Sequence, residues 1–193
     1  MRENAIPHDV VLRERDGRVG RLTINRPPLN ILNMDTFGKL RAGLADLTAG
    51  GADIIVIRSA GERAFCAGAD VGEHLPENAP RMLEAFHRLA RFLWSMDAVS
   101  VAAVRGLALG GGMELALCCD IIVASEDAQF GQPEIKLGVL PPIASVLLPS
   151  RVGRHQAADI ILTGRKISAF EALALGLVSR LAPPGEFDAE ILT

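Results

Sequence analysis

Residues 106–120 read GLALGGGMELALCCD, and this stretch carries most of the information about the fold and the site. Gly110, Gly111 and Gly112 mark the point where a strand has ended and a short apolar helix, residues 113–119, begins. Glycine lets a ligand approach the backbone closely. Because the first N–H groups of a helix have no partners within it, this turn is suited to an anion or a developing oxyanion.

Glu114 is the residue in this stretch most suited to catalysis. It lies three residues after Gly111, which puts both on one face of the predicted helix. The residues that follow, 115–119, are apolar all round, so the helix is predicted to be buried. A buried glutamate needs a partner or a function. We therefore favour a catalytic carboxylate over the alternative, a glutamate on a solvated face beside a tightly packed turn.

A dinucleotide-binding loop is a second alternative for the same glycines. Gly110 and Gly112 supply the first two glycines of G-x-G-x-x-G, but Leu115 occupies the third position. Glu134, about 20 residues further on, could be mistaken for the ribose-binding acid of such a site. It follows Pro133 in a predicted loop instead of ending a strand, which disfavours this interpretation.

Two other segments carry candidate site residues. Glu134, in FGQPEIKLG, is a second carboxylate held by Pro133 between two glycine turns, although a solvated or helix-capping carboxylate is an equally ordinary reading. In AFCAGAD, residues 64–70, small residues around Gly68 suggest close approach of a ligand to the backbone. Taken alone, however, this segment favours an ordinary turn.

The rest of the chain predicts an α/β fold, because strands and helices alternate through its middle. Asp16-Gly17 predicts a hairpin, and Asn33 predicts the start of a helix over residues 34–47. The apolar run 54–57 predicts a strand buried on both faces. The remaining expected elements are strands at 99–104, 121–124 and 177–181, and helices at 80–96, 144–152, 155–162 and 169–175. Residues 64–70, 106–112 and 130–134 are expected to be loops.

Composition and charge narrow the class of protein. The chain has 193 residues, which suits one domain. Its net charge of −3 gives no positive surplus for nucleic acid or an anionic membrane, and no stretch is long and apolar enough to cross a membrane. Three cysteines, Cys66, Cys118 and Cys119, are no disulfide framework, and the histidines lack metal-ligand spacing. A reducing cytoplasm is the expected compartment.

Three motifs together resemble one family. AFCAGAD, ALGGGMELALCCDIIVAS and AQFGQPEIKLG, in this order and at these separations, resemble the successive motifs of the enoyl-CoA hydratase/isomerase (crotonase) superfamily. RLTINRPPLNILN resembles that family's first CoA-contacting strand and loop, and LTGRKISAFEALALGLVSRL resembles its later helical segment. The likeness extends over about residues 10–183.

The resemblance implies a fold and roles for particular residues. The fold would be a spiral of ββα units, with subunits assembled as trimers or dimers of trimers. The backbone N–H groups of Ala69 and Gly111 would form an oxyanion hole. Glu114 and Glu134 match the two catalytic glutamates of the family's hydratases. The residues expected along the acyl-CoA are Ala67, Gly68, Ala69, Asp70, Gly110 and Gly111. Coenzyme A would be part of the substrate, so no separate cofactor and no metal is expected.

The two glutamates favour hydration of an α,β-unsaturated acyl-CoA thioester. An isomerase, or another acyl-CoA reaction of the family, is the first alternative, and a non-catalytic acyl-CoA-binding module is the alternative of another class. After Gly138 the sequence VLPPIAS replaces the proline and Gly-Ala-Gly-Gly usual in simple hydratases. Together with NRPPLNILN, the proline pair resembles cyclohexa-1,5-diene-1-carbonyl-CoA hydratases. A short-chain enoyl-CoA hydratase is the alternative.

Family members usually continue into further C-terminal helices. We therefore expect residues 1–193 to form one crotonase-like catalytic domain that lacks, or is truncated in, this helical region. If the region is absent, activity and trimer formation are both in doubt.

Overall fold

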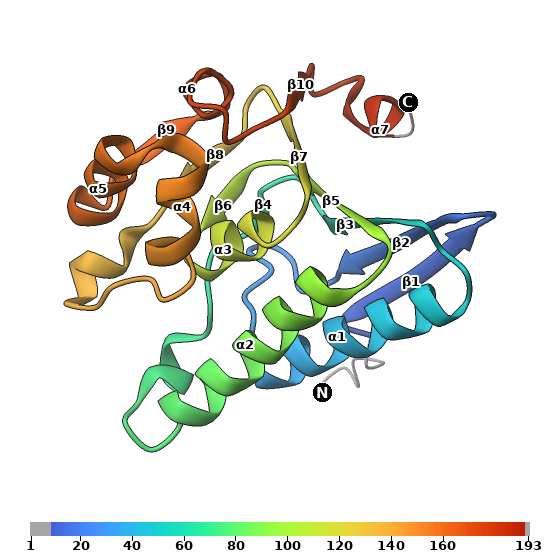
Figure 1. Cartoon of the computed structure of the whole chain (residues 1–193), viewed down its shortest axis with the longest axis horizontal. Helices are drawn as coiled ribbons and strands as arrows, with labels where there is room; N and C mark the ends of the chain where they lie inside the picture. Colours follow the sequence, from blue (N-terminus) through green and yellow to red (C-terminus); the bar gives the residue numbers. More distant parts are fainter. Residues whose placement is uncertain (1–8, 192–193) are drawn as a thin grey trace, which may run out of the picture.

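The computed structural model describes residues 9–191 and builds them around two sheets. The larger, six-stranded sheet has the order β1-β2-β3-β5-β7-β10, and the smaller, four-stranded sheet has the order β4-β6-β8-β9. In the larger sheet β1 (Val11–Asp16) and β2 (Val19–Ile24) are antiparallel, and all further neighbours are parallel. Figure 1 shows the larger sheet above α1 and α2, with the C-terminal elements at the top.

Three successive units produce this arrangement. Each gives one strand to the larger sheet, one short strand to the smaller sheet, and then a helix. The first unit is β3 (Ile54–Ser59), β4 (Ala64–Cys66) and α2 (Ala79–Ser95). The second is β5 (Val99–Val104), β6 (Leu107–Leu109) and α3 (Gly111–Leu117). The third is β7 (Ile121–Ser125), β8 (Gln129–Gly131) and α4 (Ala144–Val152). The predicted spiral of ββα units is therefore correct.

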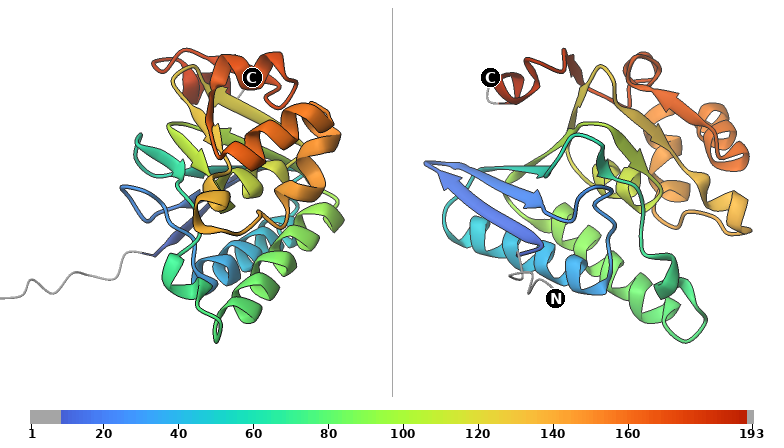
Figure 2. Two further views of the ribbon diagram at one scale, coloured as in Figure 1. Left: turned by 90° about the vertical axis from the view of Figure 1, so that its left-hand side faces the viewer. Right: turned by 180° about the vertical axis from the view of Figure 1, so that it is seen from behind.

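The main core fills the space between the larger sheet and its two long helices and extends around α3 and α4. Helix α1 (Met34–Ala49) begins at Asn33, whose side chain accepts a hydrogen bond from the Thr36 N–H as predicted. Phe37 of α1 stacks on Phe86 of α2, with ring centroids 4.7 Å apart. Strand residues alternate between faces, so Ile55 and Ile57 join this core while Val56 joins a smaller cluster with Phe187 of α7 (Phe187–Glu190). Figure 2 shows the two long helices together on one side of the sheet.

Several predicted boundaries need correction. Ile54 is 41% exposed, so the run 54–57 is not buried on both faces throughout its length. The expected loops at 64–70, 106–112 and 130–134 contain the short strands β4, β6 and β8, because three residues are too few to show a strand period. The expected helix 113–119 is α3, two residues earlier at each end, and the expected strand 177–181 is β10 (Arg180–Ala182).

The remaining elements complete the surface. The sequence did not predict η1 (Val71–His74), η2 (Pro133–Leu137), β9 (Lys166–Ser168) or α7. The predicted helix α5 (Arg154–Thr163) packs against α4, whereas the predicted helix α6 (Ala169–Ala174) contacts β8, β9 and β10 (Figure 1). Within residues 9–191, no helix combines the length and the apolar character needed to cross a membrane.

Candidate active site

Glu114 lies near the start of α3 and is almost wholly enclosed, with 3% of its surface exposed. Its Oε1 atom accepts two backbone hydrogen bonds, from the Ile143 N–H at 2.7 Å and the Ala144 N–H at 2.9 Å. Both donors stand at the beginning of α4, where unpaired amides and the helix dipole favour a negative charge. The second carboxylate oxygen has no hydrogen bond to residues 9–191, so it is available to a ligand.

Burial dominates the acidity of Glu114. Removal from water disfavours the charged form and raises the pKa of the carboxyl to about 7. The Ala144 N–H opposes this rise, the negative charge of Glu134 adds to it, and the Ile143 N–H opposes it again. A carboxyl with a pKa near neutrality can both accept and donate a proton at physiological pH.

Glu134 reaches the same place from a different element. It lies in the first turn of η2, after β8, and is partly exposed. Its Oε1 atom packs so closely on Gly110 that a side-chain carbon added to Gly110 would lie 2.5 Å from it. Burial raises the pKa of the Glu134 carboxyl, against opposing effects of its own backbone N–H and of the positive charge of His74. Both carboxyls are thus displaced toward the neutral form.

Gln132 supports Glu134, and the sequence analysis missed it. The residue is fully buried. With its carboxamide nitrogen turned toward Glu134, the orientation that hydrogen bonding favours, that nitrogen lies 3.0 Å from Oε2 and 3.3 Å from Oε1. The only available sequence signal was a glutamine two residues before the candidate glutamate, and glutamine is usually a surface residue.

The backbone amides of Ala69 and Gly111 lie side by side. A side-chain carbon added to Gly111 would lie 3.3 Å from the Ala69 nitrogen and 3.5 Å from its Cβ atom. Leu32 forms a parallel bridge opposite Ala69, donating to the Gly68 carbonyl at 3.0 Å and accepting from the Asp70 N–H at 2.8 Å. These bonds use the groups on either side of Ala69. Within residues 9–191, neither the Ala69 nor the Gly111 N–H has an acceptor, so both can donate to a ligand oxygen.

Close packing holds α3 against the strand that leads to Ala69. A side-chain carbon added to Gly112 would lie 2.1 Å from the Cys66 carbonyl oxygen, so only glycine fits there. Cys66 itself is fully buried, and burial raises the pKa of its thiol to about 12. It therefore packs as a small apolar residue and is a poor nucleophile.

Comparison with known proteins gives the family. Residues 14–193 match the family described as enoyl-CoA hydratase/isomerase. The chain is 43% identical over 193 residues to a protein of Rhizobium meliloti named "Probable enoyl-CoA hydratase", with 96% of this chain and 73% of that protein covered. The chain belongs to the enoyl-CoA hydratase/isomerase family.

Two further comparisons refine this placement. Cyclohexa-1,5-dienecarbonyl-CoA hydratase of Thauera aromatica is 39% identical over 186 residues, which cover 96% of this chain and 72% of that protein. The crystal structure of an enoyl-CoA hydratase from Bacillus anthracis is 29% identical, with a TM-score of 0.91 over 95% of this chain and 74% of that one. The predicted family and the predicted crotonase-like α/β fold are therefore confirmed.

In this enoyl-CoA hydratase/isomerase chain, the structure brings most of the predicted site residues together. Gly111 adjoins Ala69, Gly110 adjoins Glu134, and the charge of Glu134 acts on Glu114. Two residues predicted along the acyl-CoA have local roles as well. The Ala67 N–H donates to the Leu29 carbonyl at 2.9 Å, and Asp70 Oδ1 accepts from the Gly72 N–H at 2.9 Å where η1 begins. Their contact with CoA stays a prediction.

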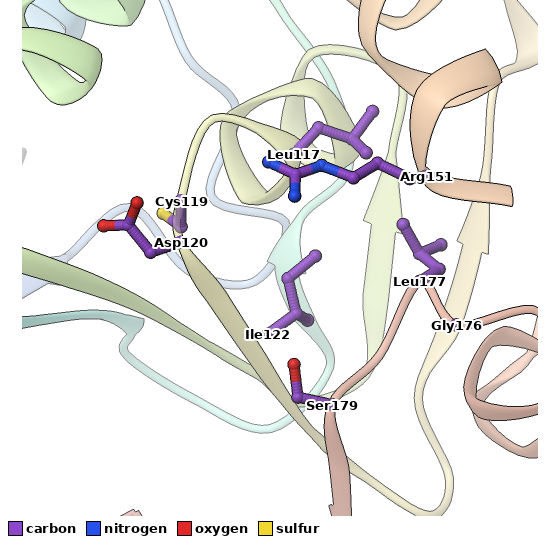
Figure 3. Close-up of a pocket in the computed structure, with 8 residues that line it drawn as sticks. All are labelled: Leu117, Cys119, Asp120, Ile122, Arg151, Gly176, Leu177 and Ser179. Atoms are coloured by element: carbon purple, nitrogen blue, oxygen red, sulfur yellow. The ribbon is translucent and has the colours of Figure 1, made fainter.

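A separate depression lies at the opposite end of α3 from the glycine turn. It is lined by Leu117, Cys119, Asp120, Ile122, Arg151, Gly176, Leu177 and Ser179. Figure 3 shows the Arg151 side chain reaching from α4 across this depression while the Asp120 carboxylate points away from it. None of the predicted site residues lines it, so it is not the site of the two glutamates.

Proposed function

We propose that this chain adds water across the double bond of an α,β-unsaturated acyl-CoA thioester. The observation that carries the proposal is the pairing of two free backbone amides, Ala69 and Gly111, with two carboxyls of raised pKa, Glu114 and Glu134. The amides suit a thioester oxygen that becomes negative as the enolate develops. Losing one such donor typically lowers a rate on the order of 10²–10³-fold.

The carboxyls suit the two proton transfers that hydration requires. Water must lose a proton as its oxygen bonds to Cβ, and Cα must gain one. We assign activation of the water to Glu114, whose second oxygen has no hydrogen bond to any of residues 9–191. We assign the holding of that water and the supply of the α-proton to Glu134, which Gln132 orients. Since each carboxyl is displaced toward its neutral form, one proton can be shared between them.

For the acyl group, we propose a cyclic diene carbonyl thioester. Pro141 and Pro142 directly precede the Ile143 N–H that holds Glu114, so this segment lies beside the reacting group. Leu137, Val139 and Leu140, between Glu134 and the prolines, are exposed apolar residues that could cover a ring. The Thauera aromatica relative, whose name specifies such a substrate, supports the same choice.

The test is a substrate panel followed by ultraviolet absorbance. Cyclohexa-1,5-diene-1-carbonyl-CoA and crotonyl-CoA are each mixed with the full chain, and loss of the conjugated band reports hydration. We expect both to react and the cyclic substrate to have the higher kcat/KM. A preference for crotonyl-CoA would overturn the cyclic assignment and leave a short-chain hydratase.

Two outcomes would overturn hydration itself. Conversion of a 3-enoyl-CoA to its 2-enoyl isomer, with no hydrated product by mass spectrometry, would make the chain an isomerase. Tight CoA binding without loss of the conjugated band would make it a non-catalytic binding module.

We also propose that the chain forms trimers or dimers of trimers. Helices α4, α5 and α6 present large exposed apolar side chains, namely Val146, Leu162, Phe170 and Leu173. Exposed apolar surface of this kind is typical of a protein interface. Light scattering coupled to size-exclusion chromatography would test this, and a monomer at micromolar concentration would contradict it.

A further inference from the structure

The outer surface of the helix pair α1–α2 carries a groove with an unusual set of charges. It is lined by Arg41 from α1 and by Arg88, Arg91, Phe92 and Ser95 from α2. Figure 1 shows the two helices side by side along one edge of the molecule. The lining residues from α2 belong to its C-terminal half, whereas its N-terminal end follows η1 and the candidate active site. The groove is therefore distinct from the site of the two glutamates.

Positive charge in this groove exceeds the negative charge available to balance it. Arg88 Nε and the Arg91 guanidinium share one oxygen of Glu84, at 2.7 Å and 3.4 Å. The hydrogen bond from Arg88 is the main cause that lowers the pKa of the Glu84 carboxyl. Arg41 has no ion pair or hydrogen bond with any of residues 9–191. Three guanidinium groups thus face one carboxylate, in a chain whose net charge is −3.

Several other arginines of the chain are balanced more fully. Arg165 has both Asp159 and Glu171, Arg13 has Asp46, and Arg18 has Asp53. Like charges gathered around a concave surface raise the local potential and attract an anion. Guanidinium groups present planar pairs of N–H donors that match phosphate oxygens in geometry, which a lysine does not offer.

We propose that this groove binds a ligand that carries two linked phosphates. Arg41 would approach one phosphate from α1, and Arg88 and Arg91 would approach the other from α2. Packed helix axes lie about 8–10 Å apart, so donors from both helices suit an extended diphosphate better than a single phosphate. The space is about 340 Å³, which admits a diphosphate together with part of an organic group on Phe92. The Ser95 hydroxyl, at the end of the groove, is a further donor.

The test titrates the full chain with inorganic pyrophosphate by isothermal calorimetry. We expect saturable binding of one pyrophosphate in the groove, and at least ~10-fold weaker binding of orthophosphate, because only the diphosphate reaches both helices. Arg41→Ala and Arg91→Ala are each expected to weaken pyrophosphate binding ~10-fold. All three arginines are exposed, so these variants should fold, which circular dichroism would verify.

Matched controls separate a built site from general attraction. Lys39→Ala removes one positive charge from the same helix but outside the groove, where Lys39 pairs with Asp35, and should leave binding within about twofold. Arg91→Lys keeps the charge but loses the paired donors, and should weaken binding about fivefold. Equal affinity for orthophosphate and pyrophosphate, or equal losses in Lys39→Ala and Arg41→Ala, would overturn the proposal.

Two natural forms of the diphosphate can be distinguished in the same assay. ADP represents a free nucleotide, and CoA carries a diphosphate of its own. Binding of ADP that Arg41→Ala weakens would identify a nucleotide site. A second CoA per chain that the same variant removes would identify coenzyme A as the source. If neither binds while Arg41 is intact, the groove holds no biological diphosphate and the proposal fails. None of these readouts depends on hydratase activity.

Discussion

The surroundings of the two glutamates differ in what holds each carboxylate. Around Glu114, two backbone amides at the start of α4 bind one oxygen, and the residue is buried. Around Glu134, a side-chain amide from Gln132 and the bare Cα of Gly110 meet the carboxylate, which is partly exposed. Backbone donors persist through most substitutions, whereas a side-chain donor can be lost in one. The geometry of Glu114 is therefore fixed by the fold, and that of Glu134 by a few individual residues.

The largest expected effect is the loss of either carboxylate. Glu114→Gln and Glu134→Gln should each lower kcat for enoyl-CoA hydration about 10²–10⁴-fold. Each substitution keeps the size of the side chain but removes a carboxyl that transfers a proton. Steady-state kinetics on the best substrate of the panel would measure the loss. The affinity for CoA, measured by calorimetry, should change little. A variant that kept more than a tenth of the activity would remove that glutamate from the mechanism.

Substitutions of Gly112 and Gly110 should differ in effect, because the first should mainly lower stability and the second mainly lower activity. Gly112→Ala forces a methyl group against the Cys66 carbonyl oxygen, which belongs to rigid backbone, so we expect a loss of about 3 kcal/mol or more in the free energy of unfolding. Gly110→Ala, at a φ of 52°, meets the movable carboxylate of Glu134. The backbone there, at φ 52° and ψ −126°, is one that only glycine adopts readily, so we expect a loss of about 1–3 kcal/mol, together with a large fall in activity.

Urea denaturation and kinetics on both glycine variants would make this comparison. Ala69→Gly serves as a control in the same site, because it adds no atoms. Greater destabilisation by Gly110→Ala than by Gly112→Ala would contradict the view that the backbone beside Gly112 is rigid and the Glu134 side chain beside Gly110 can move.

The pH dependence of the free energy of unfolding should reveal the raised pKa of the buried Glu114 carboxyl. The pKa of the Glu114 carboxyl is about 7 in the folded chain, above its ordinary value of 4.5. The folded state therefore keeps a proton that the unfolded state releases between these values. This contribution is complete below about pH 4.5 and is lost as the pH rises through 7, by up to about 3 kcal/mol. Glu114→Gln should lack this loss, so its stability relative to the wild type should increase from about pH 5 to about pH 8. If urea denaturation gave the same pH dependence for Glu114→Gln and the wild type, the pKa of Glu114 would not be raised in the folded chain.

The smallest expected effect is at Gln132. Gln132→Met keeps most of the volume but removes the amide that donates to Glu134. We expect kcat to fall about tenfold and the basic limb of the pH–rate profile to move to higher pH, since losing this donor raises the pKa of Glu134, which must be protonated to supply the α-proton. Gln132→Asn, which retains a carboxamide on a shorter chain, should recover part of the rate. An unchanged pH profile in Gln132→Met would reduce Gln132 to a packing residue.

Sequence patterns predicted β1, β2, β3, β5 and β7 of the large sheet, and its two long helices, because those elements are long. The Asp16-Gly17 turn, the Asn33 cap and the apolar runs of β3, β5 and β7 each give a signal that local physics explains. The smaller sheet gave none, because β4, β6, β8 and β9 have only three residues each. They are strands because neighbouring units of the spiral align them, which is a tertiary effect.

The candidate site likewise has features that the local sequence predicts and features that only the tertiary structure reveals. Glu114 could be recognised as a lone acid in an apolar helix, and Gly110–Gly112 as a turn with free amides. The donors to Glu114 come from residues 143 and 144, about thirty positions away, and no local pattern connects them. The role of Gln132 depends on which way a buried amide is turned. Family resemblance supplied the link between Ala69 and Gly111 that residue types alone could not.

The bridge between Leu32 and Ala69 has a consequence for how this site can be lost. In a parallel pairing, one residue bonds to the two neighbours of its partner and not to the partner itself. Leu32 bonds to Gly68 and Asp70 in this way, so the Ala69 N–H is free only while Leu32 lies opposite Ala69. Deleting one residue from the segment before Leu32 would leave the side chains of Glu114, Gln132 and Glu134 unchanged. If the pairing then shifted by one residue, the unbonded N–H would pass to Gly68 or Asp70, and Ala69 would no longer offer it to a ligand. The number of residues before Leu32 thus decides whether the Ala69 N–H, thirty-seven residues later in the chain, stays free for a ligand.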